Sequence, residues 1–158
     1  MAYDPDIHHR RSIRLPGYDY AAAGYYYVTI CTHGREITME HEQIEGVVSV
    51  AWQDLPGRFA GAGIDEFVVL ANHVHGIVVF RAGESTLGDV MRAFKSISAI
   101  AANRVLGRAG RPFWQRGYFE RIIRNERELT AVREYIRANP LNWPVDPQNP
   151  ERRRTASG

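Results

Sequence analysis

The sequence predicts one α+β domain of 158 residues, with secondary structure in the order β-α-β-β-α-β-α. Two patterns carry this prediction. Apolar residues gather in short runs rich in aromatic and β-branched types, and elsewhere they recur at helical spacing, with proline or glycine at the breaks. The first six elements match a split βαβ, ferredoxin-like arrangement with a four-stranded antiparallel sheet. The seventh is an extra C-terminal helix, which we expect beside the sheet face that the other two helices leave open.

The first half of the chain is expected to hold three strands and one helix. Tyr25–Thr32 is rich in aromatic and β-branched residues and predicts a strand. Phe67–Leu70 and Val74–Phe80 are apolar segments separated by Ala71-Asn72, and we expect them to pair as antiparallel strands. Before them, Pro56-Gly57 is expected to end an amphipathic helix whose apolar residues are Ile44, Val47, Val48, Ala51 and Leu55.

The second half is expected to add two helices and a strand. A helix capped by Ser85 or Thr86 is predicted by an apolar stripe at Leu87, Val90, Met91, Phe94, Ile97 and Ala101. After a basic loop at Gly107–Pro112, the aromatic segment Phe113–Ile123 predicts a strand. The last helix should begin after Asn125, an N-cap with Glu128 at capping-box spacing, and Pro140 should end it. Its apolar stripe is Leu129, Val132 and Ile136.

Charge and composition limit the setting of the protein. The net charge is +2, which is compatible with nucleic acid without requiring it. No segment reaches the roughly 18–20 apolar residues of a membrane helix, and the start of the chain lacks an apolar signal core. With Cys31 as the single cysteine, we expect a reduced, cytoplasmic protein. Residues 1–24 are expected to form an N-terminal arm of the single domain 1–158, and residues 144–158 a flexible basic tail.

A His-x-His pair opens the third predicted strand, in Asn72-His73-Val74-His75. Side chains alternate along a strand, so both imidazoles face one side, with Cα atoms about 7 Å apart. Two imidazoles on a rigid strand can bind one metal ion, and ordinary half-buried histidines would show the same pattern. A nucleotide hydrolase of the histidine-triad kind would need a third alternating histidine, and Ile77 occupies that position.

The last predicted helix carries Tyr135 and Asn139 one turn apart, at the edge of its apolar stripe. From that edge both side chains can reach a sheet and remain accessible. The same spacing also suits a packing tyrosine followed by an asparagine that caps the helix. Tyr118 is a rival reactive tyrosine, but its aromatic neighbours favour packing or base stacking.

Taken together, four segments resemble the single-tyrosine HUH transposases of the insertion-sequence and REP-associated tyrosine transposase kind. The resemblance covers roughly residues 11–143. One departure is visible, because Ala71 stands where the family usually has proline before the Asn-His pair. The matching segments are Arg11–Tyr20, Tyr27–Thr32, Asn72–His75 and Trp114–Pro140.

The resemblance implies an enzyme that cuts and rejoins single-stranded DNA at hairpins through a 5′-phosphotyrosine intermediate. It implies that Tyr135 is the nucleophile and that His73, His75 and Asn139 bind a divalent metal, Mg²⁺ or Mn²⁺. It also leaves a homodimer or a monomer open. Basic residues that would contact DNA are Arg11, Arg14, Lys95, Arg116, Arg121 and Arg124.

Two other functions stay compatible with the sequence. A ferredoxin-like sheet is a common platform for single-stranded nucleic acid, so the chain could be a catalytically silent module that binds hairpin DNA or RNA. It could also be a metal-dependent hydrolase of small phosphate esters, which would use the two histidines and leave Tyr135 dispensable.

Overall fold

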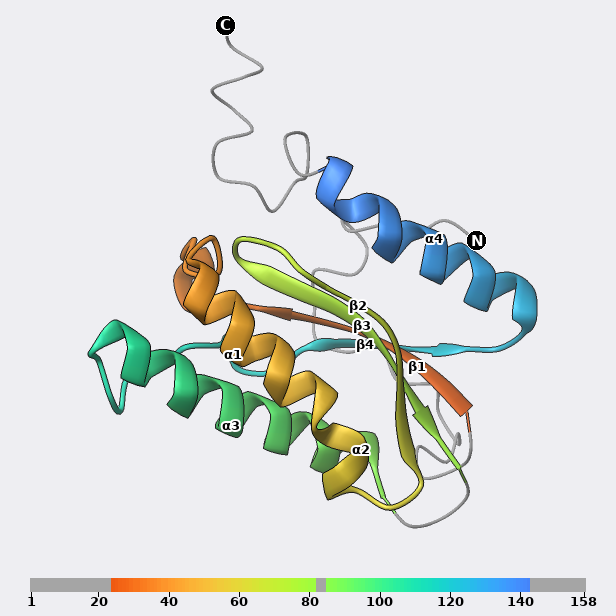
Figure 1. Cartoon of the computed structure of the whole chain (residues 1–158). Coiled ribbons are helices and arrows are strands. Elements are labelled where there is room, and N and C mark those ends of the chain that lie inside the picture. The colour runs from red at the N-terminus through yellow and green to blue at the C-terminus, as the bar shows by residue number, and fades with distance from the viewer. Residues whose placement is uncertain (1–23, 82–84, 143–158) are drawn as a thin grey trace, which may run out of the picture.

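A computed structural model describes residues 24–81 and 85–142 as a four-stranded antiparallel sheet between two helical layers (Figure 1). The strand order is β2-β3-β1-β4, so β3 and β1 are the central strands and β2 and β4 are the edge strands. This confirms the predicted α+β, ferredoxin-like fold. The elements are β1 (Gly24–Cys31), a 3-10 turn (His33–Arg35), α1 (Glu42–Gln53), α2 (Leu55–Arg58), β2 (Ala62–Val69), β3 (His73–Phe80), α3 (Leu87–Leu106), β4 (Phe119–Ile123) and α4 (Glu126–Asn142).

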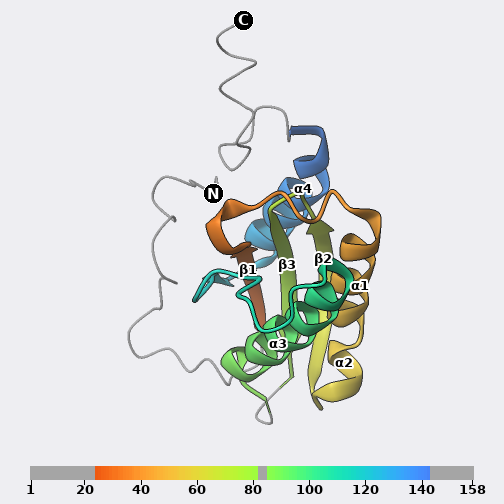
Figure 2. The same cartoon turned by 90° about the vertical axis from the view of Figure 1, so that its left-hand side faces the viewer.

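The three long helices divide between the two faces of the sheet. α1 and α3 cover one face, and α4 crosses the other (Figures 1 and 2). Alternation along β3 explains this division, since Val74 and Val78 belong to the core under α1 and α3, whereas Ile77 packs under α4. The smaller core under α4 consists of Tyr27, Ile77, Phe119, Ile123, Leu129 and Ile136.

The larger core contains an aromatic stack that requires glycine on β3. Trp52 of α1 stacks on Phe67 of β2 with ring centroids 4.4 Å apart, and Phe94 of α3 meets its edge. A Cβ atom added at Gly76 would lie 2.5 Å from the Trp52 ring. The absence of a side chain at Gly76 therefore allows α1 to pack directly on the centre of the sheet.

We expect Gly76→Ala to lower the free energy of unfolding by about 1–3 kcal/mol, because the stack on Phe67 and the contact with Phe94 restrict movement of the indole ring. Urea denaturation followed by circular dichroism measures the change. Gly63→Ala on β2 is the matched control, since its added Cβ would meet its nearest neighbour at an ordinary 3.7 Å. Equal stability of the two variants would contradict this packing argument.

Pro56 and Pro140 were predicted to end helices, but each lies within a helix in the structure. Pro56 lies in the first turn of the short helix α2, where a missing N–H costs nothing, so the chain turns at Asp54 and continues helically. Pro140 lies inside α4, which runs on to Asn142. The lost backbone hydrogen bond falls in the last turns of α4, where the helix is close to its end in any case.

Two strand boundaries also differ from the prediction. β2 starts at Ala62 rather than Phe67, because a register shift between Ile64 and Phe67 interrupts the alternation that marks a strand. β4 starts at Phe119 rather than Phe113. Before it, Gly117 adopts a positive φ of 69° and separates the buried aromatic residues from the strand.

Both helix caps agree with the structure. Thr86, one of the two expected caps, accepts a hydrogen bond from the backbone of Asp89 at the start of α3. Asn125 accepts one from the backbone of Glu128 at the start of α4. Among the described residues, no helix is both long and apolar enough to span a bilayer. Of the expected N-terminal arm, residues 1–23 lie outside the described residues, and Gly24 is the first residue of β1. The expected tail, residues 144–158, also lies outside the described residues.

Candidate metal and tyrosine site

The two histidines of β3 converge on the sheet face that α4 covers. The Nε2 atoms of His73 and His75 are 3.1 Å apart, with the rings nearly perpendicular. Two nitrogen ligands that each lie about 2.1 Å from one metal ion are separated by roughly 3.0–3.4 Å in octahedral or tetrahedral geometry. The separation of the imidazoles therefore suits a shared cation.

Asn72 determines which nitrogen of His73 carries the proton. Its Nδ2 donates to the carbonyl of Arg35 at 3.3 Å, so its Oδ1 faces Nδ1 of His73 at 2.9 Å. An amide oxygen only accepts, so Nδ1 of His73 donates and Nε2 keeps its lone pair. This is the tautomer that binds a metal through Nε2.

Two hydroxyl groups of β1 surround the other nitrogen of His75. The oxygens of Tyr27 and Thr29 each lie 2.8 Å from Nδ1 of His75. In the tautomer with Nδ1–H donating to these oxygens, Nε2 of His75 also keeps its lone pair. In the other tautomer, Nδ1 of His75 accepts from a hydroxyl, and its Nε2–H donates to Nε2 of His73 across 3.1 Å. A divalent cation would take the place of that proton and be held by both lone pairs.

We expect Tyr27→Phe to weaken divalent-metal affinity by about 10–100-fold, because His75 loses one of the groups that orient its ring. Isothermal titration with Mn²⁺ measures the affinity. Tyr26→Phe is the matched control, since Tyr26 is equally buried but belongs to the core on the opposite face of the sheet. Unchanged Mn²⁺ affinity in Tyr27→Phe would contradict the orienting role.

Burial keeps both imidazoles neutral. It lowers the pKa of His73 to about 3, and the positive charge of Arg35 adds to the effect. Burial and then the neighbouring His73 hold the pKa of His75 well below its ordinary value. At neutral pH both rings are therefore uncharged, which is the form that donates a lone pair to a metal.

α4 brings Tyr135 to this pair. The Tyr135 ring lies 5.5 Å from the His75 ring and 6.5 Å from the Tyr27 ring, measured between centroids. Asn139 follows one turn later and is 2% exposed, and its Nδ2 donates to the Tyr135 carbonyl at 2.9 Å. That bond leaves the Asn139 Oδ1 as the atom of this side chain that could bind a metal. The four residues predicted from sequence thus come from one strand and one helix on the same face.

The donor set around the imidazoles is small. Within residues 24–81 and 85–142, no cluster of three or more histidine, cysteine, aspartate or glutamate side chains could hold a metal. Two neutral imidazoles, even with the Asn139 amide oxygen added, differ from a closed structural zinc site, which has four protein ligands. A set of this size would leave coordination positions for phosphate oxygens and water.

Four of the basic residues expected to contact DNA are described. Lys95 donates to the carbonyls of Gln115 and Gly117, at 2.7 and 3.1 Å, and burial lowers its pKa. It therefore holds the loop before β4, a role that the sequence did not predict. Arg116 and Arg124 are exposed, and Arg121 pairs with Glu128 at 3.8 Å. Arg11 and Arg14 lie outside the described residues, and DNA contact by all six stays a prediction.

Four residues near the histidine pair have roles that the sequence did not predict: Tyr27, Thr29, Asn72 and Arg35. Tyr27 and Thr29 on β1 could have been found from strand alternation, but only with the pairing partner of β1 known. Asn72 was noted within the motif without its hydrogen bond. Arg35 carried no signal, although it is exposed, has a positive φ of 56° and lies near enough to His73 to affect its pKa.

Known proteins resemble this chain over most of its length. The family model described as "Transposase IS200 like" matches residues 22–139, which include both histidines, Tyr135 and Asn139. An uncharacterised protein of Haemophilus influenzae is 32% identical over 175 aligned positions, which cover 91% of this chain and 95% of that protein.

Two solved structures share the fold. A REP-associated tyrosine transposase bound to a REP hairpin superposes with a TM-score of 0.59 and 21% identity, covering 82% of this chain and 74% of that one. A candidate transposase of Deinococcus radiodurans superposes with a TM-score of 0.53 and 18% identity, covering 79% of this chain and 95% of that one.

Proposed function

The chain belongs to the IS200-like transposase family, and from that premise we propose that it cleaves and rejoins single-stranded DNA through a covalent bond to Tyr135. One observation carries the proposal: the facing Nε2 atoms of His73 and His75, 3.1 Å apart, with the Tyr135 ring packed against one of the two imidazoles. Family membership supports a transposase, and this geometry supports Tyr135 as its nucleophile.

We propose Mg²⁺ or Mn²⁺ as the cofactor, held by His73, His75 and the amide oxygen of Asn139. A bound divalent cation would withdraw charge from a phosphate oxygen and orient the phosphate for in-line attack. The chain supplies neutral imidazoles whose outer nitrogens are held by Asn72, Tyr27 and Thr29. Because both rings are kept uncharged by burial, they are ready to bind at neutral pH.

Tyr135 performs the covalent step. Its phenolic oxygen attacks the phosphorus, the bond from phosphorus to the 3′-oxygen breaks, and the phenol loses its proton to solvent while the leaving 3′-oxygen gains one. The products are a 5′-phosphotyrosine and a free 3′-hydroxyl. Attack by a second 3′-hydroxyl reverses the step and joins new ends, so no ATP is needed.

We propose single-stranded DNA with a hairpin as the substrate, because a structural neighbour is bound to a REP hairpin. Phosphate contacts would come from basic residues around the site. We include Arg35 among them, because it is exposed and its positive charge is close enough to lower the pKa of His73. Arg116, Arg121 and Arg124 extend the positive charge along and beside β4.

A denaturing-gel assay tests the proposed function. The probe is a pool of oligonucleotides with a central hairpin flanked by randomised single-stranded arms, labelled at either the 3′ or the 5′ end. We expect the 3′ label to enter a protein adduct and the 5′ label to appear on a shortened fragment, with Mg²⁺ or Mn²⁺ and not with EDTA. Hairpin binding that survives EDTA, without any adduct in either metal, would favour a silent binding module instead.

A further inference from the structure

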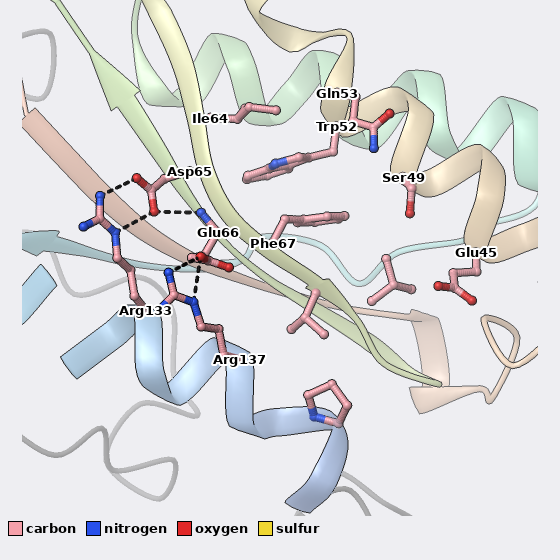
Figure 3. Close-up of a pocket in the computed structure, with 13 residues that line it drawn as sticks. Glu45, Ser49, Trp52, Gln53, Ile64, Asp65, Glu66, Phe67, Arg133 and Arg137 are labelled. Atoms are coloured by element: carbon pink, nitrogen blue, oxygen red, sulfur yellow. Dashed lines mark hydrogen bonds and ion pairs between the residues drawn. The ribbon is translucent and has the colours of Figure 1, made fainter. Parts of the chain in front are cut away.

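Two ion pairs join the tyrosine helix to the edge strand β2 (Figure 3). Arg133 meets Asp65 through two parallel hydrogen bonds, Nε to Oδ1 at 2.9 Å and Nη2 to Oδ2 at 2.7 Å. One turn later, Arg137 donates from Nε to Oε1 of Glu66 at 2.8 Å, and its Nη2 approaches the same oxygen. We name these four residues the β2–α4 clamp.

The clamp depends on an irregularity in β2. Adjacent side chains of a regular strand point to opposite faces, so Asp65 and Glu66 could not both reach one helix. The register shift between Ile64 and Phe67 falls at these two residues, and both carboxylates bond to α4. On the helix, Arg133 and Arg137 are four residues apart and therefore share a face. The two carboxylates of β2 are therefore spaced to meet the two arginines of α4.

The clamp residues differ in how far they are shielded from water. The side chains of Arg133 and Asp65 are 33% and 17% exposed, whereas Arg137 is 61% exposed. Hydrogen bonds from Arg133 hold the pKa of Asp65 below its ordinary value, so this carboxylate stays ionised at neutral pH. A bidentate arginine–carboxylate pair fixes direction as well as distance. The Arg133 pair is therefore the stronger constraint of the two.

The rest of the α4 interface is apolar and constrains direction less. Leu129 and Ile136 are buried, and Val132 and Tyr135 pack beside them on the small core of this face. Apolar packing is non-directional and tolerates small rotations and shifts of a helix. Tyr135 lies between the two clamp arginines in the sequence. The clamp holds α4 at two points one turn apart, so it fixes both the rotation of the helix about its axis and its position along that axis, and with them the position of Tyr135.

We propose that Arg133–Asp65 and Arg137–Glu66 are positioning pairs that hold Tyr135 at the histidine pair of its own chain. This inference rests on the proposed function. Misplacement of a reacting group by about 1 Å can cost 10²-fold in rate, so loss of the clamp should slow the chemical step. The clamp residues bond to one another across β2 and α4, and we do not expect them to contact the substrate, so hairpin affinity should change much less.

The test compares single-turnover adduct formation with hairpin affinity, using the 3′-labelled hairpin pool and Mn²⁺. For Arg133→Gln we expect the rate at saturating DNA to fall by about 10²-fold, with the dissociation constant of the hairpin nearly unchanged. The charge-swapped double variant Asp65→Arg/Arg133→Asp should recover most of the rate. Arg127→Gln is the matched control, since it removes the same charge from an exposed position on α4. An unchanged rate in Arg133→Gln, or no recovery in the double variant, would overturn the inference.

Mixing two inactive variants tests assembly within one chain. Tyr135→Phe lacks the nucleophile and His75→Ala lacks a metal ligand, so a mixture forms adduct only if a tyrosine helix serves the sheet of another chain. We expect no adduct in the mixture. Adduct near one quarter of the wild-type yield, the share of intact sites that random pairing of the two variants would give, would overturn assembly within one chain.

Hydrogen exchange separates failure of the clamp from failure of the proposed function. Absence of adduct in the unmodified protein would contradict the proposed function alone. The clamp would still predict faster exchange of the α4 amides in Arg133→Gln than in Arg127→Gln, with β3 amides unaffected. Equal α4 exchange in the two variants would overturn the clamp whatever the outcome of the adduct assay.

Discussion

Tyr135→Phe should abolish the covalent protein–DNA adduct, with a loss on the order of 10³-fold or more. The substitution removes the only oxygen of the side chain and keeps the ring that packs at 5.5 Å from His75. Stability and Mn²⁺ affinity should therefore change little, while the bond to phosphorus cannot form. Denaturing gels with 3′-labelled hairpin oligonucleotides measure the loss.

Tyr118→Phe is the control for this result. Tyr118 packs beside the core under α1 and α3, on the opposite side of the sheet from the histidine pair. Its variant should form adduct at close to the wild-type rate. Wild-type adduct in Tyr135→Phe, together with loss in Tyr118→Phe, would move the nucleophile to the other face and refute the assigned site.

His75→Ala should abolish high-affinity Mn²⁺ binding and reduce adduct formation by about 10²–10³-fold, the size of effect seen when one group that stabilises transition-state charge is removed. His75 is central to the site, because its Nε2 faces His73 while its Nδ1 contacts Tyr27 and Thr29. Removal therefore breaks both the imidazole pair and the hydrogen bonds from Tyr27 and Thr29 behind it. Isothermal titration and the adduct assay, run side by side, measure the two effects.

The matched control is His33→Ala, which removes an exposed imidazole outside the pair. It should keep both Mn²⁺ affinity and activity. Thermal unfolding checks that His75→Ala remains folded, since the residue is buried. A folded His75→Ala that binds Mn²⁺ and forms adduct normally would show that the two imidazoles do not serve as a metal site.

Local signals in the sequence were sufficient for most of the fold. Asn125 and Thr86 are caps whose side chains accept backbone hydrogen bonds, and such bonds depend on neighbouring residues only. The apolar stripe of α3 was likewise visible because the packing of a helix follows its own periodicity. Errors arose at Pro140, which lies so near the end of α4 that the helix tolerates it, and at the start of β2, where a register shift interrupts the alternation that marks a strand.

The reactive and metal-binding residues proposed for the site could be predicted from sequence, but the residues that orient them could not. His73, His75, Tyr135 and Asn139 lie in two short motifs, so spacing alone brought them into consideration. Asn72 is adjacent to His73 in the sequence, but the hydroxyl groups that orient His75 come from β1, which reaches β3 only through the register of the sheet. The β2–α4 clamp was hidden for the same reason, since Asp65 and Arg133 are 68 positions apart.

Mass spectrometry of the covalent adduct tests the central claim most directly. After reaction with the hairpin pool in Mn²⁺ and digestion with protease and nuclease, we predict a nucleotide 5′-phosphate on the peptide that contains Tyr135, and none on it when EDTA is present. A phosphate on a different tyrosine, or on Tyr135 regardless of metal, would contradict a metal-dependent nucleophile at the imidazole pair.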